Sequence, residues 1–319
     1  QEIQDRCSDK CERVLSRIGR QFESDKTYYT SDLSYMNALW YAFKILFDKG
    51  LIYQGKKVMP YSYGCQTALS NFEANQNYQI VTHMSLYLKF KISNKDDEYF
   101  LVWTTTPWSL VANQALCLNQ DLEYVLVEDN KSESKYWVAK ELYPNIFKKE
   151  EKIIDKKLGK ELKNLKYIPV FNFFDQELFI TLNDNYVTNE SGTGIVHMAP
   201  LFGADDFRVC QDNNIINNMA SNLPNFLNGE AKIKKNILIG DKDIKDMLLL
   251  DISDIVIGYL KEENLYFKKE SIKHKYPFCW RTDTPLIYLA QNSWFLNVQK
   301  IKDDLIKNNS EIKWFPEFV

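Results

Sequence analysis

Apolar residues recur at helical spacing in the first fifty residues of the chain. Between residues 2 and 20 they come every three or four positions, and Gly19 is typical of a helix end. The run from Leu33 to Lys49 repeats this spacing, with Asp32 placed to cap its start and Gly50 placed to close it. The pattern predicts two amphipathic helices ahead of the main domain.

From residue 51 onward the pattern changes to short runs of β-branched and aromatic residues. A first strand is expected at residues 51–62, and residues 61–78 are polar and loop-rich. The later runs predicted as strands are 80–84, 85–92, 98–105, 116–118, 124–127, 136–139, 170–174, 178–182 and 195–197. Several short strands in succession favour a closed or partly closed sheet.

Few further helices are predicted after residue 78. Residues 140–166 are rich in Lys and Glu, which predicts a helix followed by a solvated segment. Residues 205–213 also have a helical pattern. The Asn-rich stretch 213–229 is expected to be a loop or insertion, and residues 244–261 mix helix and strand signals.

Composition and charge limit the classes of function. The chain has 319 residues, 45% hydrophobic and 26% charged, which is typical of one large or two ordinary soluble domains. The net charge of -3 argues against a protein wrapped in nucleic acid along its length, although it allows a local basic groove. No apolar run reaches the roughly 18 residues of a membrane span, and we expect no membrane association.

Neither the cysteines nor the histidines have the spacing of a metal site. Six cysteines are scattered along the chain, which fits reduced thiols and a cytoplasmic location. His83, His197 and His274 lie far apart, and no CxxC or HxxxH pattern occurs. The patterns GxSxG, GxxxxGK[ST] and GxGxxG are also missing, so a nucleophilic triad or a nucleotide loop has no support.

A run of three threonines ends one of the predicted strands. Thr104, Thr105 and Thr106 follow the strand and precede Pro107, which removes a backbone donor and favours the first turn of a helix. Each threonine hydroxyl can both donate and accept a hydrogen bond. This strand end is either an ordinary solvated edge or the wall of a polar site.

A second stretch carries a histidine and two aspartates. Gly192 and Gly194 allow tight turning ahead of a strand that ends at His197, and Asp205 and Asp206 begin the next helix. Acids at a helix N-terminus are often only caps, and a histidine in this position is often a core residue. Together with the threonines, however, His197 and Asp206 would bind a polar substrate and position water without forming a covalent intermediate.

The two stretches resemble the editing domain of isoleucyl-tRNA synthetases of the eukaryotic cytoplasmic type. The matching blocks are Trp103–Leu110 with Asn113, Gly192–Pro200 with Asp206, Val58–Ser62, Leu69–Glu73 and Tyr276–Leu286. Leucyl and valyl relatives carry arginine after the second threonine, where this chain has Thr106, and His197 also points to the isoleucyl branch. The HIGH and KMSKS motifs of aminoacylation are not present.

The resemblance implies an α+β fold that is mainly β, with a β-barrel core and flanking helices. It implies a helical junction segment at residues 1–77 leading from a catalytic domain, an editing domain at 78–275 and a return segment at 276–319. Both ends look like positions inside a longer synthetase chain.

The function implied by the resemblance is hydrolysis of valyl-tRNA(Ile), with valyl-adenylate as a further candidate substrate. A hydrophobic pocket separates isoleucine from valine by only about 1–3 kcal/mol, an established limit for synthetases of this kind, so a second site must remove the smaller product. The parent enzyme would join isoleucine to tRNA(Ile) with ATP and Mg²⁺, whereas this part of it would need no cofactor.

Residue roles follow from the same resemblance. Asp206 would hold the substrate ammonium, and Thr104 and Thr105 would act with it on the ester, the terminal ribose or the water. Further substrate contacts are expected from Trp103, Thr106, Asn113 and His197, of which Trp103 and His197 would exclude isoleucine. The pattern identifies no general base.

Two further expectations concern metal and RNA. Zinc-binding relatives have CxxC at two loops where this chain keeps only Cys65 and Cys279, so we expect no metal but a short distance between these two thiols. The 3′ end of tRNA would be held by stacking and basic contacts. The candidate residues are Lys56, Lys57, Lys268, Lys269, Lys273, Lys275 and Arg281.

Three alternatives stay open at this point. The chain could be an editing domain of the valyl type that clears threonine. It could be a noncatalytic tRNA-binding module, although the intact threonines and Asp206 argue against a decayed site. It could also be a free-standing hydrolase, against which the flanking blocks argue.

Overall fold

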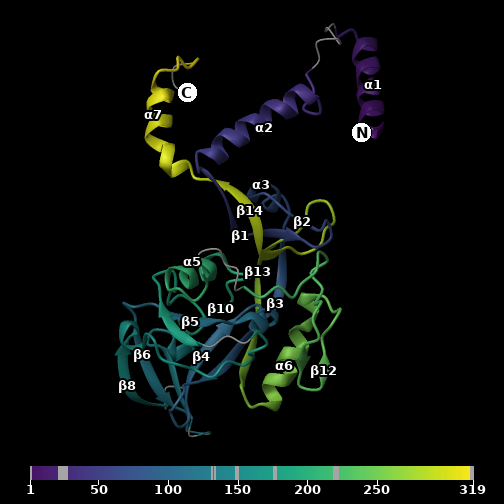
Figure 1. Cartoon of the computed structure of the whole chain (residues 1–319). Coiled ribbons are helices and arrows are strands. Elements are labelled where there is room, and N and C mark those ends of the chain that lie inside the picture. Colours follow the sequence, from purple (N-terminus) through teal and green to yellow (C-terminus); the bar gives the residue numbers. More distant parts are fainter. Residues whose placement is uncertain are drawn as a thin grey trace. The chain divides into compact units, whose positions relative to one another are not determined.

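β3 (Tyr78–Lys91) and β13 (Tyr266–Pro277) pair antiparallel over most of their length and bring residues far apart in sequence side by side (Figure 1). They belong to a computed structural model that describes residues 2–20, 28–130, 132, 134–147, 151–174, 178–217 and 223–316. The chain divides into two compact units, one of Gln1–Gln54 with Trp294–Val319 and the other of Gly55–Ser293.

The first unit is largely helical. Its helices are α1 (Glu2–Arg17), α2 (Leu33–Asp48), η5 (Val298–Ile301) and α7 (Lys302–Ser310). The two helices predicted from periodicity are confirmed at α1 and α2. The predicted cap is wrong in detail, because the Asp32 side chain makes no capping hydrogen bond to α2.

The second unit contains most of the β structure. Its strands are β1 (Ile52–Ser62, which begins in the first unit), β2 (Thr67–Ala68), β3, β4 (Glu98–Thr104), β5 (Ala115–Leu118), β6 (Glu123–Glu128), β7 (Lys135–Ala139), β8 (Lys152–Leu158), β9 (Ile180–Asn183), β10 (Ile195–Met198), β11 (Leu238–Ile239), β12 (Lys242–Asp243), β13 and β14 (Ile287–Leu296, which ends in the first unit). Its helices are α3 (Asn71–Ala74), η2 (Pro107–Ala112), α4 (Tyr143–Ile146), η3 (Gly159–Leu162), α5 (Ala204–Asp212), η4 (Leu249–Ile252) and α6 (Ser253–Glu262).

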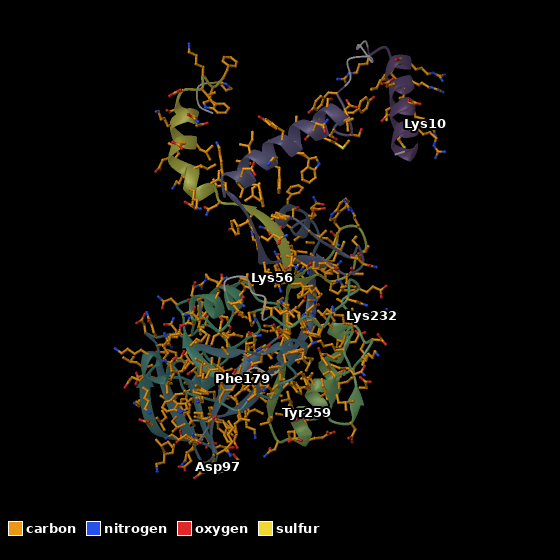
Figure 2. All side chains as sticks on the ribbon, viewed as in Figure 1. Lys10, Lys56, Asp97, Phe179, Lys232 and Tyr259 are labelled. Carbon is orange, nitrogen blue, oxygen red and sulfur yellow. The ribbon has the colours of Figure 1, made fainter. Side chains whose placement is uncertain are left out.

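Two sheets enclose the main core. A six-stranded sheet has the order β13-β3-β4-β7-β6-β8, and a three-stranded sheet has the order β10-β5-β9. The largest cluster of buried side chains takes Leu88 and Phe100 from the first sheet and Leu116 and Ile195 from the second. Phe179, labelled in Figure 2, belongs to the same cluster. The predicted fold is confirmed as a mixed fold that is mostly β sheet.

Two local predictions in this unit are wrong. Helical structure within residues 140–166 is limited to the short α4 and η3, and Lys152–Leu158 forms β8 at the edge of the six-stranded sheet. Lysines on an edge strand stay in water while the backbone pairs with β6, so sheet pairing overrides the helical preference of Lys and Glu. The strand expected at residues 170–174 is irregular, whereas residues 178–182 contribute to β9.

Two kinds of feature do not occur among the described residues. None of the helices there is both long enough and apolar enough to cross a membrane. The described ranges also contain no group of three or more His, Cys, Asp or Glu side chains arranged to hold a metal ion. The segment boundaries at 77/78 and 275/276 stay a prediction.

Candidate active site

The threonine run is folded into a chain of hydroxyl contacts where β4 ends and η2 begins. Pro107 occupies the first turn of η2, as its fixed φ favours. The Thr106 amide donates to Thr104 Oγ1 over 3.1 Å, and the two threonine hydroxyls lie 3.3 Å apart. Ser109 continues the chain, because its Oγ lies 3.0 Å from Thr106 Oγ1 and donates to the Thr106 carbonyl.

His197 lies on β10 and contacts this hydroxyl chain directly. Its Nε2 is 3.0 Å from Ser109 Oγ, so the two sequence stretches meet at a buried hydrogen bond. Burial lowers the pKa of His197 to about 4, and the ring is therefore neutral at pH 7. Its Nδ1 is buried and has no hydrogen-bond partner among the described residues.

Gly192, in the turn before β10, lets the chain approach Trp103. Gly192 has φ +72°, a left-handed conformation that glycine adopts without strain. A Cβ at Gly192 would lie 2.9 Å from Cε3 of Trp103. The small residue therefore allows the loop to pack against the indole ring, which forms part of the cavity wall.

Asp206 is held in the first turn of α5 by the loop that precedes the helix. Its Oδ2 accepts a hydrogen bond from the Ala199 amide over 2.8 Å, and its Oδ1 lies 3.5 Å from the Tyr186 hydroxyl. Burial raises the pKa of Asp206 to about 6, assisted by the charge of Asp205 and opposed by the Ala199 hydrogen bond. Asp205 itself is exposed and lies 3.6 Å from Arg208.

These groups line one cavity of about 300 Å³ in the second unit. The lining residues are Trp103, Thr104, Thr105, Thr106, Trp108, Ser109, Val196, His197, Ala199, Phe202, Gly203, Asp206, Tyr276 and Tyr288. All the residues predicted to act on the substrate are among them except Asn113. The cavity combines an acid, several hydroxyls and an aromatic wall, as expected for a small polar substrate with a cationic group.

Asn113 lies outside the cavity and has a structural contact instead. Its Nδ2 donates to the Ala115 carbonyl, and its Oδ1 accepts a hydrogen bond from the Tyr167 hydroxyl over 2.7 Å. The side chain is buried, so this geometry gives no support to the predicted substrate contact. Asn113 fixes the chain between η2 and β5.

The sequence prediction missed Ser109 and several aromatic residues. Ser109 stands three residues after Thr106, and the turn of η2 at this spacing brings the two hydroxyls together. This three-residue spacing is the feature of the sequence from which the contact could have been predicted. Tyr276 and Tyr288 come from β13 and β14, and no local pattern marks them as neighbours of the threonines.

A second cavity adjoins the first. It has about 410 Å³ and shares Thr105, Thr106, Trp108 and Tyr276 with the first cavity. Its other walls include His83, whose Nδ1 lies 3.0 Å from His274 Nε2. The threonine run thus separates two neighbouring spaces.

The predicted proximity of Cys65 and Cys279 is confirmed, because their sulfur atoms are 3.8 Å apart. Burial acts to raise the pKa of Cys279. Hydrogen bonds from the Ser62 and Thr282 side chains and from the backbone of Arg281 and Thr282 outweigh this effect and lower the pKa to about 6.

The candidate RNA-binding residues come from β1, from β13 and from the segment after β13. Lys56 lines another cavity, whereas Lys57, Lys269, Lys273 and Lys275 are exposed. Two further candidates have acidic neighbours: Lys268 lies 2.7 Å from Glu270, and Arg281 lies 3.9 Å from Glu73. Arg281 also stacks on the Trp280 ring.

Comparison with known proteins identifies the family. The model described as tRNA synthetases class I (I, L, M and V) matches residues 1–319, and the chain therefore belongs to this family. Within it, the chain is 42% identical to an isoleucine–tRNA ligase of Tetrahymena thermophila over 310 residues, covering 95% of this chain and 28% of that protein. It is 39% identical over 320 residues to the cytoplasmic isoleucine–tRNA ligase of Mus musculus, covering 98% of this chain and 25% of that protein.

The chain thus spans between a quarter and a third of the length of these relatives. Among solved structures it is similar to GlLeuRS-CP1, with a TM-score of 0.45 at 12% identity over 61% of this chain and 99% of that chain. It is also similar to the P. knowlesi cytosolic leucyl-tRNA synthetase editing domain, with a TM-score of 0.45 at 13% identity over 58% of this chain and 95% of that chain.

Proposed function

We propose that the chain is the editing domain of an isoleucyl-tRNA synthetase and hydrolyses valyl-tRNA(Ile). The observation that carries the proposal is the presence of Thr104–Thr106, His197 and Asp206 on the walls of one cavity of about 300 Å³. Editing is needed because the synthetic site of such an enzyme cannot reject valine by fit alone.

Asp206 binds the ammonium group of the valyl ester. At neutral pH its carboxylate is ionised in a poorly solvated position, since burial raises its pKa to about 6. The substrate ammonium forms a charge-assisted hydrogen bond with this carboxylate, which replaces the hydrogen bonds that water would donate to it. The Ala199 amide, 2.8 Å from Oδ2, keeps the carboxylate aimed in one direction.

The remaining walls set the size of the side chain and the position of the ester. His197, Trp103 and Thr106 limit the space for the amino-acid side chain, and a neutral His197 adds no charge that would repel the ammonium. Thr105 and Thr106 separate this space from the adjoining cavity, where the terminal nucleoside of the tRNA lies. The ester bond is then located beside the threonine hydroxyls, which donate hydrogen bonds to it.

Hydrolysis proceeds by attack of water on the ester carbonyl carbon. The tetrahedral intermediate expels the ribose oxygen, which takes up a proton, and valine leaves as its carboxylate. No covalent bond forms to the protein. A neighbouring ribose hydroxyl assists the water, and no side chain is assigned as general base. The same water would attack the acyl carbon of valyl-adenylate.

The partners and location follow from the same proposal. The chain is part of a larger synthetase that uses ATP and Mg²⁺ to join isoleucine to tRNA(Ile) in the cytoplasm, whereas the cavity itself uses no cofactor. The relatives from Mus musculus and Caenorhabditis elegans are both named as cytoplasmic isoleucine–tRNA ligases.

The test compares Asp206→Ala with Asp205→Ala in hydrolysis of valyl-tRNA(Ile). Loss of a hydrogen bond to a charged group, worth about 1.5–3 kcal/mol, predicts a fall in kcat/KM of roughly 10- to 150-fold for Asp206→Ala. Asp205 is the matched control because it is adjacent but exposed. Circular dichroism should show that both variants are folded.

The same assay separates the alternatives. Hydrolysis of threonyl-tRNA(Val) in preference to valyl-tRNA(Ile) by the unmodified chain would identify the valyl type. Binding of tRNA without any hydrolysis would identify a noncatalytic module. Equal activity of Asp206→Ala and the unmodified chain would exclude the ammonium role.

A further inference from the structure

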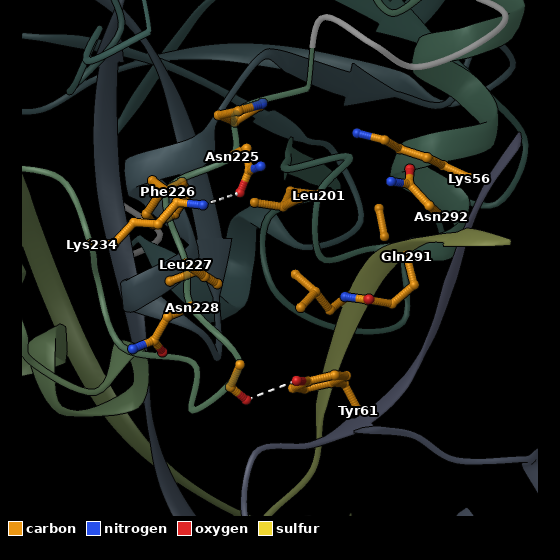
Figure 3. Close-up of a pocket in the computed structure, with 14 residues that line it drawn as sticks. Lys56, Tyr61, Leu201, Asn225, Phe226, Leu227, Asn228, Lys234, Gln291 and Asn292 are labelled. Atoms are coloured by element: carbon orange, nitrogen blue, oxygen red, sulfur yellow. Dashed lines mark hydrogen bonds between the residues drawn. The ribbon is translucent and has the colours of Figure 1, made fainter. Parts of the chain in front are cut away.

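A third cavity of about 400 Å³ lies in the second unit, away from the threonines (Figure 3). Its walls come from β1, from the loop after β10, from residues 224–234 and from β14. The polar side chains that line it are Lys56, Tyr61, Asn225, Asn228, Lys234, Gln291 and Asn292. This volume is within the usual range of ligand sites.

The cavity is cationic in a chain that is acidic overall. Lys56 and Asn292 lie on one side of it and Lys234 and Asn225 on the other (Figure 3). None of the described residues that line it is Asp or Glu, and within the described part of the chain neither lysine forms an ion pair. Two ammonium groups in a cavity with no acidic lining residue among those described favour an anion.

The contacts of the two lysines leave their charge available. Lys234 Nζ donates to Asn225 Oδ1 over 2.7 Å, which fixes the ammonium with a neutral partner. Burial lowers the pKa of Lys56, as expected for a partly desolvated ammonium without a nearby counter-charge. An incoming anion would offset this desolvation.

A thin wall separates this cavity from the candidate active site. In the loop after β10, Ala199 and Phe202 face the active-site cavity while Leu201 faces the cationic one. In β14, Tyr288 lines the first cavity, and Leu289 begins the run of residues that lines the second. The Ala290 amide donates to the Leu201 carbonyl over 2.8 Å and joins the two sides of the wall.

We propose that the cationic cavity binds a phosphodiester of the single-stranded 3′ end of tRNA, upstream of the esterified ribose. This inference rests on the proposed editing function. Under this proposal the phosphates upstream of that ribose lie on the far side of this wall, where the two lysines supply the charge that a phosphate needs. The amide side chains of Asn225, Gln291 and Asn292 can hydrogen-bond ribose hydroxyls and base edges.

The test measures binding of an RNA oligonucleotide with the sequence of the tRNA 3′ end to the 319-residue chain. The variant Lys56→Gln/Lys234→Gln removes both ammonium groups. The control Lys242→Gln/Lys245→Gln removes the same charge from two exposed positions outside the cavity. The cavity variant should bind RNA about 5- to 10-fold more weakly than the control, and its logarithmic salt dependence should be less steep by about 0.7 for each phosphate that the lysines no longer neutralise.

A second arm separates this proposal from the editing function. Valyl-adenosine carries the ester but no upstream phosphate, so the cavity variant should hydrolyse it at the unmodified rate while its KM for valyl-tRNA(Ile) rises. If the unmodified chain hydrolyses neither ester, the editing function fails, and the RNA-binding arm still tests the cavity. Equal RNA affinity and equal salt dependence in the two double variants would overturn the proposal. If binding of inorganic phosphate depends on the two lysines and binding of RNA does not, the RNA assignment is overturned in favour of a free anion.

Discussion

Ser109 Oγ and His197 Nε2 lie 3.0 Å apart and form a buried hydrogen bond between the threonine motif and β10. Because His197 Nδ1 has no partner in the described part of the chain, this is the ring's one hydrogen bond there. Ser109→Ala should therefore lower the free energy of unfolding by about 1–3 kcal/mol, since it leaves a buried ring without any partner. Urea unfolding measures this change. Ser271→Ala, at an exposed position of β13, is the control and should change stability little; equal losses would contradict the role of the hydrogen bond.

Truncation of the cavity wall should weaken the exclusion of isoleucine. His197→Ala and Thr106→Ala both enlarge the space beside Asp206, and one methylene accounts for about 1–3 kcal/mol of discrimination. Hydrolysis of isoleucyl-tRNA(Ile) should rise roughly 10- to 100-fold in these variants. Thr106→Ser keeps the hydroxyl that contacts Ser109 but removes the methyl group. It therefore separates the effect of hydrogen bonding from the effect of side-chain size. Full protection of isoleucyl-tRNA(Ile) in all three variants would exclude a steric role.

Much of the candidate site could be predicted because its residues fall in two short stretches of the sequence. Thr104, Thr105 and Thr106 are consecutive, and His197 and Asp206 lie on the strand and helix that flank one loop. Side chains at the end of a strand and the start of the next helix commonly meet at one edge of a sheet. What joined the two stretches was the resemblance to a family, since spacing alone allowed a structural role for each residue.

The rest depended on contacts that no local pattern encodes. Asn113 follows the threonine motif, yet its amide is taken up by Ala115 and Tyr167, and the contact with Tyr167 spans 54 positions. The Lys-rich β8 also looked helical, because pairing with β6 depends on residues outside the segment. Tyr276 and Tyr288 enter the cavity from strands far along the chain.

The pH dependence of stability should carry the signature of Asp206. Because its pKa in the folded state is about 6, above its ordinary value of 3.8, the folded state binds a proton more tightly than the unfolded state. Stability contributed by this proton is present below pH 4 and is lost as pH rises through 6. Asp206→Asn should therefore match the unmodified chain near pH 4 and become more stable by at most about 3 kcal/mol at pH 7. A stability difference that does not change with pH would contradict the raised pKa.

His197 should give the opposite dependence. Its pKa is lowered from 6.5 to about 4, so the folded state binds a proton less tightly than the unfolded state. The stability from a neutral ring is present above pH 6.5 and is lost as pH falls through 4. In the unmodified chain the two residues should offset one another between pH 4 and 6. In His197→Gln the free energy of unfolding, measured with urea, should therefore fall with rising pH across this range more clearly than in the unmodified chain, because only the Asp206 effect remains.

Gly203 should be required for the position of the Asp206 carboxylate. A Cβ at this residue would lie 2.5 Å from Asp206 Cγ, although its φ of -110° is open to any residue. Gly203→Ala should displace the carboxylate and reduce kcat/KM for valyl-tRNA(Ile) by roughly 10-fold or more, with the fold retained. Gly258→Ala, in α6 with open space around its Cβ, is the matched control and should keep full activity. Normal activity of Gly203→Ala would show that the carboxylate need not be fixed.

Cys65 and Cys279 should form a disulfide under mild oxidation. Their sulfur atoms are 3.8 Å apart, and hydrogen bonds lower the pKa of Cys279, which favours its thiolate form. Hydrogen peroxide would oxidise Cys65, the more exposed sulfur, to a sulfenic acid, and the Cys279 thiolate would displace hydroxide from it, giving a disulfide and two waters overall. Intact mass and peptide mapping should detect this bond in a Cys7→Ser/Cys11→Ser background, which removes the two exposed thiols of α1. Cys65→Ser and Cys279→Ser should each abolish it. If both thiols stay reduced at a peroxide concentration that oxidises Cys7 and Cys11 of the unmodified chain, the reaction is excluded.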